Sequence, residues 1–492
     1  MLNIRYVLLF IQFSYNLYVY EIKNTRRFKV ERPNAWKDYS DKDMEQLNKL
    51  GASYTEFISN NKTERECVAS AVEIAEANGY KNLNDLIANN TALKTGDRVY
   101  AVNHDKTLLM VELGSEPLQN GLNILGAHVD SPRLDIKQNP LEEKSEIAFL
   151  DTHYYGGIKT YQWVTIPLAI HGVFCKKDGT TVKVSIGEKD TDPVFVISDI
   201  LPHLGRKQAE LKLNDGVAGE DLDLIIGNRP AKLEDDEEAK DLVAKTIIDI
   251  LKAEYGVEEE DFLSAELEVV PAGAARDCGL DRSMILGYGH DDRCCSYPSL
   301  LAQIEVVDPK RTAVCLLVDK EEIGSVGATG MTSKFFENAM AEIFVLAGET
   351  HPLALRRCLT NSFMLSSDVS ACFDPAFANV FEKKNACFMG HGLAFNKYTG
   401  GRGKGGSNDA DAEYMAKIRS IMDERNVKFQ TCELGKVDAG GGGTIAYILA
   451  KYDMHVIDSG IGVLSMHAPW ELISKADLFE AYKGYKAFLD LA

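Results

Sequence analysis

Short apolar runs of about strand length recur along the chain, at residues 121–127, 312–318, 361–367 and 454–458. The run at 312–318 contains β-branched residues and no charged residue, a pattern typical of a central strand in an α/β sheet. Each run leads to a side chain that is able to bind a metal or move a proton. Because open α/β sheets hold ligands at the carboxyl ends of their strands, the pattern predicts a site at one sheet edge.

The first run delivers a histidine and a carboxylate two residues apart, His128 and Asp130. Residues two apart point to one side of an extended backbone, so Asp130 is able to orient the His128 ring. A metal-bound histidine normally donates its second ring nitrogen to such a partner. A lone histidine at a strand end is more often structural, and an acidic pair such as Glu321 and Glu322 is more often solvated. A metal site is therefore favoured because several apolar runs, and not one alone, lead to a potential ligand.

A further candidate lies in the turn at 287–293, ahead of an expected helix. Carboxylates at a helix start also offset the helix dipole, so this structural role stays open for Asp291. The candidate ligands offer nitrogen and oxygen atoms and no thiolate: His128, Asp291, Glu322, Asp368 and His467. Such a set suits zinc, cobalt or manganese better than calcium or an iron–sulfur cluster.

Eight motifs follow one another along the chain: AHVDSPRLD, YGGI, GHDDR, DKEEIGSVGATGM, LSSDVSACFDP, KYTGGRGKGGSNDADAEY, DAGGGGTIA and SMHAPWE. In this order they resemble the aspartyl aminopeptidase and vacuolar aminopeptidase family of dinuclear zinc exopeptidases, in particular its bacterial branch. The resemblance covers the chain from about Pro33 to the C-terminus. It implies a metal-dependent aminopeptidase that hydrolyses N-terminal residues from peptides with a free N-terminus. It also implies an α/β fold, with a mixed sheet flanked by helices and an inserted β-rich dimerisation domain.

The same resemblance implies two divalent metal ions per subunit, with zinc expected first and cobalt or manganese as alternatives. Asp291 is then the ligand that bridges the two ions. His128 and Asp368 complete one metal site, and Glu322 and His467 complete the other.

Three neighbouring carboxylates take other roles in this interpretation. Glu321 is the general base, which takes a proton from the attacking water and passes it to the leaving amine. Asp130 steadies His128 without binding metal. Asp292 is the alternative to Asp291, which we prefer because the first acid of this turn is the bridging residue in the wider clan.

Two residues outside the ligand set match family segments that contact substrate. His203 matches a histidine that enters the active site of the neighbouring subunit and supports the oxyanion and substrate; without the resemblance, a surface histidine is the simpler interpretation. Tyr398, in the turn at 397–401, is a second substrate-contact candidate. The glycines at 440–443 predict a turn that lets the backbone approach substrate, ahead of a helix at 444–446. Their spacing is neither a P-loop nor a dinucleotide fingerprint.

The motif order predicts three parts. Residues 1–32 lie outside the resemblance, residues 33–131 and 287–492 form the catalytic domain, and residues 132–286 form the inserted dimerisation domain. In the family such an insertion builds a large hollow assembly, so we expect a homo-oligomer made of dimers, up to a dodecamer.

Local patterns add four expected elements. The stretch at 41–79 is helical, with a capped start at Thr63. Strands are expected at 181–186 and 265–270, and an acidic helix at 232–255. The run Glu234–Glu238 in that helix is expected to be a solvated face.

Composition restricts the partners and the compartment. A formal net charge of -20 argues against nucleic acid and anionic membranes, since both attract a positive surface. With 492 residues, of which 45% are hydrophobic, the chain is long enough for two or more domains. The 10 cysteines include no Cys-x-x-Cys pair, which is typical of reduced thiols in a cytoplasmic protein.

The N-terminal stretch Ile4–Tyr20 is apolar and resembles a signal peptide. It lacks a small-x-small cleavage site, and Gln12, Ser14 and Asn16 interrupt it, so it is also a poor membrane span. An unrelated extension and a start codon placed too far upstream are the alternatives, and we expect a cytoplasmic protein.

Two other functions fit parts of the pattern. A related dinuclear zinc deacylase or glutamyl-type aminopeptidase would share the metals and differ in its pocket. A non-catalytic self-assembling scaffold or cargo would keep the fold without the catalytic residues. Such a protein has no need of a base at Glu321. The chain departs from the acidic-specific branch around His391–Phe395, so the resemblance does not fix whether acidic or neutral N-terminal residues are preferred.

Overall fold

The computed structural model describes residues 33–232, 240–401 and 405–492, and residues 34–492 form one compact unit. The extension at 1–32 and the acidic run Glu234–Glu238 lie outside the described residues. None of the helices in the described ranges combines the length and apolar character that a membrane span requires.

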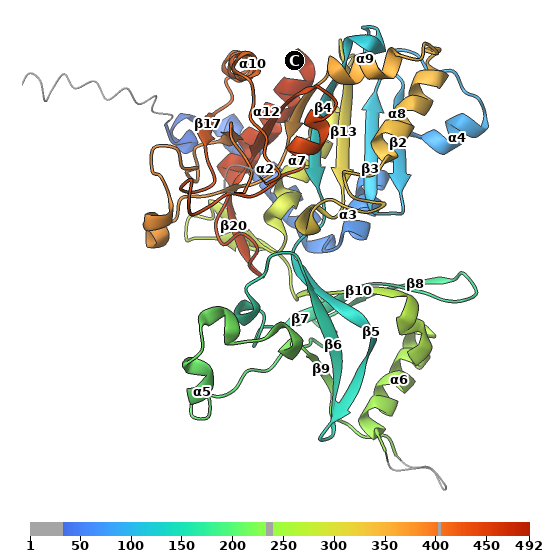
Figure 1. Cartoon of the computed structure of the whole chain (residues 1–492), viewed down its shortest axis with the longest axis vertical. Helices are drawn as coiled ribbons and strands as arrows, with labels where there is room; N and C mark the ends of the chain where they lie inside the picture. The colour runs from blue at the N-terminus through green and yellow to red at the C-terminus, as the bar shows by residue number, and fades with distance from the viewer. Residues whose placement is uncertain (1–32, 233–239, 402–404) are drawn as a thin grey trace, which may run out of the picture. The chain divides into compact units, whose positions relative to one another are not determined.

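A nine-stranded mixed sheet forms the centre of the α/β part (Figure 1). Its strands, in spatial order, are β1 (Lys81–Asn82), β2 (Arg98–Asn103), β3 (Thr107–Glu112), β13 (Thr312–Val318), β4 (Leu122–His128), β14 (Phe363–Ser366), β18 (His455–Gly460), β16 (Leu393–Asn396) and β17 (Phe429–Cys432). The central strands β13, β4, β14 and β18 run parallel, whereas β3 and β16 pair antiparallel with them. The predicted mixed sheet is confirmed, and the strand predicted at 312–318 has the same bounds in the structure.

Helices cover both faces of this sheet (Figure 1). The α-helices of the described residues are α2 (Asp41–Asn60), α3 (Glu64–Ala77), α4 (Leu83–Ala88), α5 (Arg206–Ala209), α6 (Leu242–Tyr255), α7 (His290–Glu305), α8 (Phe335–Leu346), α9 (Ala354–Thr360), α10 (Ala412–Glu424), α11 (Ala446–Ala450) and α12 (Lys475–Leu491). In β13, Cys315 and Leu317 face a core shared with α2, α3, α7 and α12. Val314 and Leu316 face a second core shared with α8, α9 and α11. Alternate residues of one buried strand thus serve two cores, as the pleat requires.

The helical stretch predicted at 41–79 forms two helices rather than one. Ser40 caps α2 and Thr63 caps α3, and each cap is a reciprocal capping box with the acidic residue three positions later. The predicted capped start at Thr63 is confirmed, and the chain leaves the helical conformation between Asn60 and Glu64.

A second, six-stranded sheet is inserted in the chain between β4 and α7 (Figure 1). Its strands, in spatial order, are β8 (Thr181–Ile186), β7 (Leu168–Cys175), β10 (Ala265–Pro271), β5 (Arg133–Lys144), β6 (Ile147–Tyr155) and β9 (Leu224–Gly227). All neighbouring pairs are antiparallel, and Trp163 is fully buried in the core that this sheet shares with α6. The strands predicted at 181–186 and 265–270 are both present.

The prediction of an acidic helix at 232–255 is wrong at the N-terminal end of that range. The helix α6 begins only at Leu242. The residue before it, Asp241, has φ 52° and ψ 42°, a left-handed conformation that a right-handed helix cannot contain. Lys232 and Lys240, the other described residues of this stretch ahead of α6, are not helical either.

Two small sheets join segments that flank the carboxyl edge of the large sheet. One contains β11 (Arg276–Cys278), β12 (Met284–Gly287) and β20 (Glu471–Ser474). The other pairs β15 (Ser370–Ala371) with β19 (Gly462–Val463). These short strands hold the connections that carry Asp291, Asp368 and His467 close to one another.

Candidate metal centre

The carboxyl ends of the central strands bring the predicted ligands to one edge of the nine-stranded sheet. β13 and β4 are paired up to Val318 and His128, the last residue of each strand. Glu321 and Glu322 begin the short helix η7 (Glu321–Ile323) just beyond β13, and Asp368 lies just beyond β14. The sheet register therefore places side chains that are far apart in sequence at the same edge.

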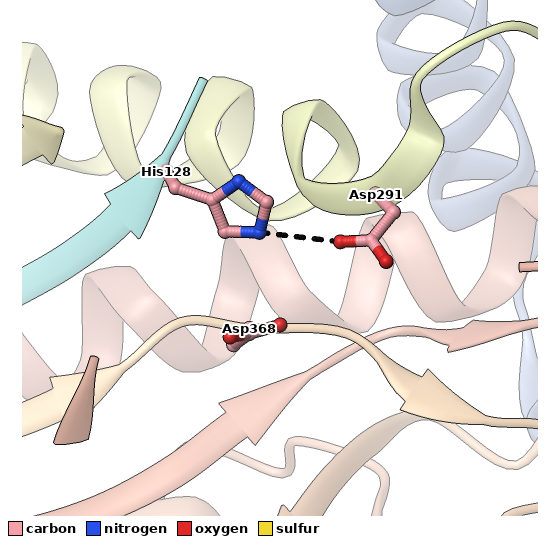
Figure 2. A group of neighbouring side chains, drawn as sticks. All are labelled: His128, Asp291 and Asp368. Atoms are coloured by element: carbon pink, nitrogen blue, oxygen red, sulfur yellow. Dashed lines mark ion pairs between the residues drawn. The ribbon is translucent and has the colours of Figure 1, made fainter. Parts of the chain in front are cut away.

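Three groups of potential ligands form at this edge among the described residues, and Asp291 belongs to two of them. Of these two, one contains His128, Asp291 and Asp368, and the other contains Asp291, Glu322 and His467. In each group the candidate ligand atoms lie within 4.8 Å of one another. Figure 2 shows the first group, with His128 from the end of β4, Asp291 from the start of α7 and Asp368 from the opposite side.

The two oxygens of Asp291 face different histidines. His128 Nε2 lies 3.2 Å from Asp291 Oδ1, and His467 Nε2 lies 3.4 Å from Asp291 Oδ2. His467 Nε2 is also 3.6 Å from Glu322 Oε2. A carboxylate that turns one oxygen to each group is able to bridge two cations.

Asp292, the sequence alternative to Asp291, belongs to neither group. Its Oδ2 accepts a hydrogen bond from the backbone amide of His128 at 3.2 Å, and burial raises its pKa well above the ordinary value. Asp292 therefore holds the end of β4, and the geometry favours Asp291 as the bridging residue.

Glu321 and Glu322 differ in what their carboxylates contact. Burial raises the pKa of Glu321 to about 7, and the negative charges of Asp130 and Asp291 act in the same direction. Glu322 Oε1 is buried and has no hydrogen-bond partner among the described residues. A buried carboxylate oxygen without a donor fits a cation ligand, because such oxygens are otherwise hydrogen-bonded. Glu321 also lies within 4.8 Å of His128 and Glu322, so geometry alone leaves a third possible group.

Asp130 lies where the sequence places it, beside His128, and it contacts more than that ring. His128 Nδ1 lies 3.0 Å from the backbone oxygen of Asp130 and 3.2 Å from its Oδ1. The two carboxylate oxygens of Asp130 also accept the backbone amides of Glu321 and Glu322, each at 3.1 Å. Asp130 therefore orients the histidine and the glutamate pair together.

The sequence interpretation missed a second buried carboxylate with a similar role. Glu471, at the start of β20, accepts the backbone amide of Asp291 at 3.0 Å and that of His467 at 2.7 Å. Burial, together with the charge of Asp291, raises the pKa of Glu471 to about 8. The only signal in the sequence was its place as the last residue of the motif SMHAPWE.

A cavity of about 640 Å³ opens onto this edge. Asp291, Glu321, Glu322, Asp368 and His467 all line it. Its other walls come from the turn around Tyr398 and from the predicted glycine turn at 440–443, which precedes α11. Backbone thus approaches the cavity closely at 440–443, where side chains would occupy the space that a ligand needs.

The two residues predicted to contact substrate lie in different parts of the structure. Tyr398 lies on the cavity wall and is 52% exposed. His203 is exposed in the connection before α5, in the inserted part of the chain, and it does not line the cavity of its own subunit. The role of His203 in the cavity of a neighbouring subunit therefore stays a prediction.

Comparison with known proteins decides the family. The model of the M18 family, described as aminopeptidase I zinc metalloprotease, matches residues 57–489. A probable M18 family aminopeptidase 1 from Clostridium acetobutylicum is 57% identical over 460 residues, which cover 94% of this chain and 98% of the relative. The chain belongs to the M18 aminopeptidase family. It is thus a peptidase, a hydrolase of peptide bonds, as the resemblance predicted.

Solved M18 structures agree with this fold. The crystal structure of aminopeptidase I from Clostridium acetobutylicum has a TM-score of 0.87 at 56% identity, covering 93% of this chain and 99% of that one. The M18 aminopeptidase from Thermotoga maritima has a TM-score of 0.89 at 42% identity, covering 94% of this chain and 100% of that one. Yeast aminopeptidase 1, at 20% identity and a TM-score of 0.71, has the same fold.

Proposed function

We propose that this M18 aminopeptidase removes N-terminal residues from peptides at a centre of two divalent ions, with Glu321 as the general base. The observation that supports the proposal most directly is the pair of ligand groups that share Asp291. His128 and Asp368 would complete the first metal site, and Glu322 and His467 the second. When bound, two such cations, zinc first among them, activate a water molecule, polarise the scissile carbonyl and hold the free amine.

The protein's own groups account for the proton transfers. Glu321 lines the cavity beside both ligand groups, where its carboxylate would accept a proton from the attacking water and return it to the leaving amine. Asp130 keeps Glu321 in place through the backbone amide, and Tyr398 is positioned on the wall to contact the peptide.

The experiment is to measure the metal content and turnover of one purified sample on a panel of aminoacyl substrates. The proposal predicts two metal ions per chain, loss of turnover on chelation, and recovery with zinc, cobalt or manganese. One ion per chain, or full turnover after chelation, would contradict it. A well-assembled, metal-loaded protein without turnover would favour the scaffold alternative instead.

We also propose that residues 132–286 form an assembly domain and that residues 33–131 and 287–492 form the catalytic domain. Large apolar side chains are exposed around His203: Ile200, Leu201, Leu204, Leu211 and Leu213. An exposed apolar patch of this kind favours a protein–protein interface. A homo-oligomer built from dimers, up to a dodecamer, would cover the patch and bring His203 to a neighbouring cavity. A solved yeast relative of this fold is described as a dodecamer.

Sedimentation of the purified chain tests the assembly, and Leu204→Asp tests the interface. Leu204 is 71% exposed, so a charge there should be tolerated in a monomer and should disrupt a buried contact. Val437→Asp, at an exposed residue on the cavity rim, is the control and should leave the mass unchanged. A monomeric wild-type chain would contradict the proposal.

We place the enzyme in the cytoplasm. All ten cysteines are free, and the majority are buried, which suits a reducing compartment. Cell fractionation with an antibody to the protein tests the location.

A further inference from the structure

The motif Tyr155-Gly156-Gly157 lies at the end of β6, in the six-stranded sheet, and nothing in the proposed chemistry uses it. Its tyrosine hydroxyl donates a hydrogen bond to Asp130 Oδ2 at 2.8 Å, and Tyr155 is 7% exposed. Asp130 is the residue that orients His128 and accepts the amides of Glu321 and Glu322. One buried hydroxyl from the inserted sheet thus supports a carboxylate that touches both metal groups and the base.

Gly157, two residues after Tyr155, contacts the opposite side of the predicted metal centre. The carbonyl oxygen of Gly157 accepts a hydrogen bond from His467 Nδ1 at 2.9 Å. This contact assigns the proton to Nδ1 and leaves Nε2, which faces Asp291 and Glu322, free to bind a cation.

Gly156 and Gly157 both lie so close to predicted ligands that a Cβ atom would crowd them. A Cβ on Gly157 would lie 3.1 Å from His467 Nδ1, so a side chain there would push the imidazole. Gly156 has a φ of +76°, and a Cβ on it would lie 3.3 Å from Glu322 Cβ. The segment therefore packs directly against two predicted ligands.

Ionic contacts hold this segment firmly. Tyr155 and Arg133 are cross-strand neighbours in the β5–β6 pair, and the Arg133 guanidinium lies 3.9 Å from the Tyr155 ring centroid. Arg133 in turn pairs with Glu268 of β10 at 3.1 Å and with Glu64 of α3 at 3.4 Å. The inserted sheet is thus tied to the helix layer of the large sheet at the point where it meets the metal centre.

We propose that the segment Tyr155-Gly156-Gly157 positions the predicted ligands His128, Glu322 and His467, so that the inserted sheet sets the affinity of the centre for divalent metal ions. The inference rests on the proposed two-metal function, and it adds positioning residues from a sheet that supplies no ligand itself. Tyr155 acts through Asp130, and Gly157 acts through the orientation of the His467 ring.

The principal test is Tyr155→Phe, which removes one hydroxyl and keeps the ring against Arg133. Loss of such an outer partner typically weakens metal binding about 10–100-fold, so zinc affinity measured by competition with a chelator should fall by that factor. Tyr154→Phe is the matched control, because Tyr154 is the adjacent strand residue, points to the other face and is 49% exposed. It should bind zinc like the wild type.

Thermal unfolding with and without zinc separates positioning from general stability. Zinc raises the unfolding midpoint by an amount that grows with the logarithm of its affinity, so Tyr155→Phe should show a smaller zinc-dependent rise while the metal-free midpoint stays near that of the wild type. A lower metal-free midpoint with an unchanged zinc-dependent rise would mean that Tyr155 only stabilises the fold, and would overturn the proposal.

Gly157→Ala provides a second, independent variant. It should weaken zinc binding at the group with His467 and leave the group with Asp368 loaded, giving one tight and one weak ion per chain. Wild-type protein that holds two ions, together with unchanged affinities in Tyr155→Phe and Gly157→Ala, would overturn this inference and leave the proposed function intact. Wild-type protein that binds no metal would overturn both this inference and the proposed function. Asp291→Asn, which removes the shared carboxylate, is the metal-free reference.

Discussion

The two groups of predicted ligands share Asp291 but differ in their access to the cavity. In the first group His128 is 1% exposed and Asp368 is 7% exposed. In the second group the His467 side chain is 36% exposed, although Glu322 beside it is 4% exposed. His128 ends β4 and Asp368 closely follows β14, whereas Glu322 lies in η7 and His467 lies in the connection before β20. Asp291, at the start of α7, belongs to both groups.

This difference in burial predicts different roles for the two groups of one metal centre. The ligands of the first group are the more buried, so we expect a metal bound there to be retained more firmly. The second group faces the open cavity, where an incoming peptide is able to approach its metal.

Glu321→Gln should have the largest effect, because Glu321 lies between the two groups and is the predicted base. Loss of a general base typically lowers kcat about 10²–10⁴-fold. Both metals should stay bound, because glutamine keeps the shape and Asp291, Glu322, His128, Asp368 and His467 are unchanged. Turnover and metal content are measured on the same sample. A rate within a few-fold of wild type would remove Glu321 from the mechanism.

The matched substitution is Glu322→Gln, one residue along. It should release the ion of the second group and retain that of the first. Unchanged metal content in Glu322→Gln, with metal loss in Glu321→Gln, would show that the roles of the two glutamates are reversed.

His203→Ala should change neither group but should lower kcat, since His203 is predicted to act on a neighbouring subunit. Loss of one oxyanion donor costs about 10²–10³-fold in kcat. Exchange of subunits between His203→Ala and Glu321→Gln protein should restore part of the activity, because mixed interfaces rebuild complete sites. His203→Ala with full activity would exclude this residue from catalysis.

Asp368→Asn and His467→Gln separate the two groups directly. Each should weaken one metal by at least about 10–100-fold, the typical cost of disturbing even an outer partner. In wild-type protein a chelator should remove metal in two phases, and we expect Asp368→Asn to abolish the slow phase and His467→Gln the fast one. A single phase in the wild type would mean that burial does not distinguish the two groups.

Glu471→Gln should have the smallest effect, about tenfold in metal affinity, because the amide side chain keeps an acceptor for one of the two backbone amides. Glu480→Gln is the control. Glu480 is equally buried and accepts the backbone amide of Lys428, but it lies outside both ligand groups. Equal zinc affinities in Glu471→Gln and in wild type would show that the turns around Asp291 and His467 hold without this carboxylate.

Patterns that are local in the chain were predictable from the sequence. The strand at 312–318 and the capping box at Thr63 depend on neighbouring residues, and both are present. The acidic helix failed at its start because Asp241 adopts a left-handed conformation, which composition does not encode. The ligand candidates were visible because each follows a strand, and parallel strands bring their carboxyl ends together.

The support of the centre was decided only by the tertiary structure. Glu471 holds Asp291, Asp130 holds the glutamate pair, and Gly157 holds His467 through hydrogen bonds to or from backbone groups. Such contacts join segments that are far apart in sequence, and a backbone amide or carbonyl looks the same at every residue. The sequence by itself therefore determined which side chains are able to bind metal, whereas the folded chain decided which oxygen or nitrogen each one presents.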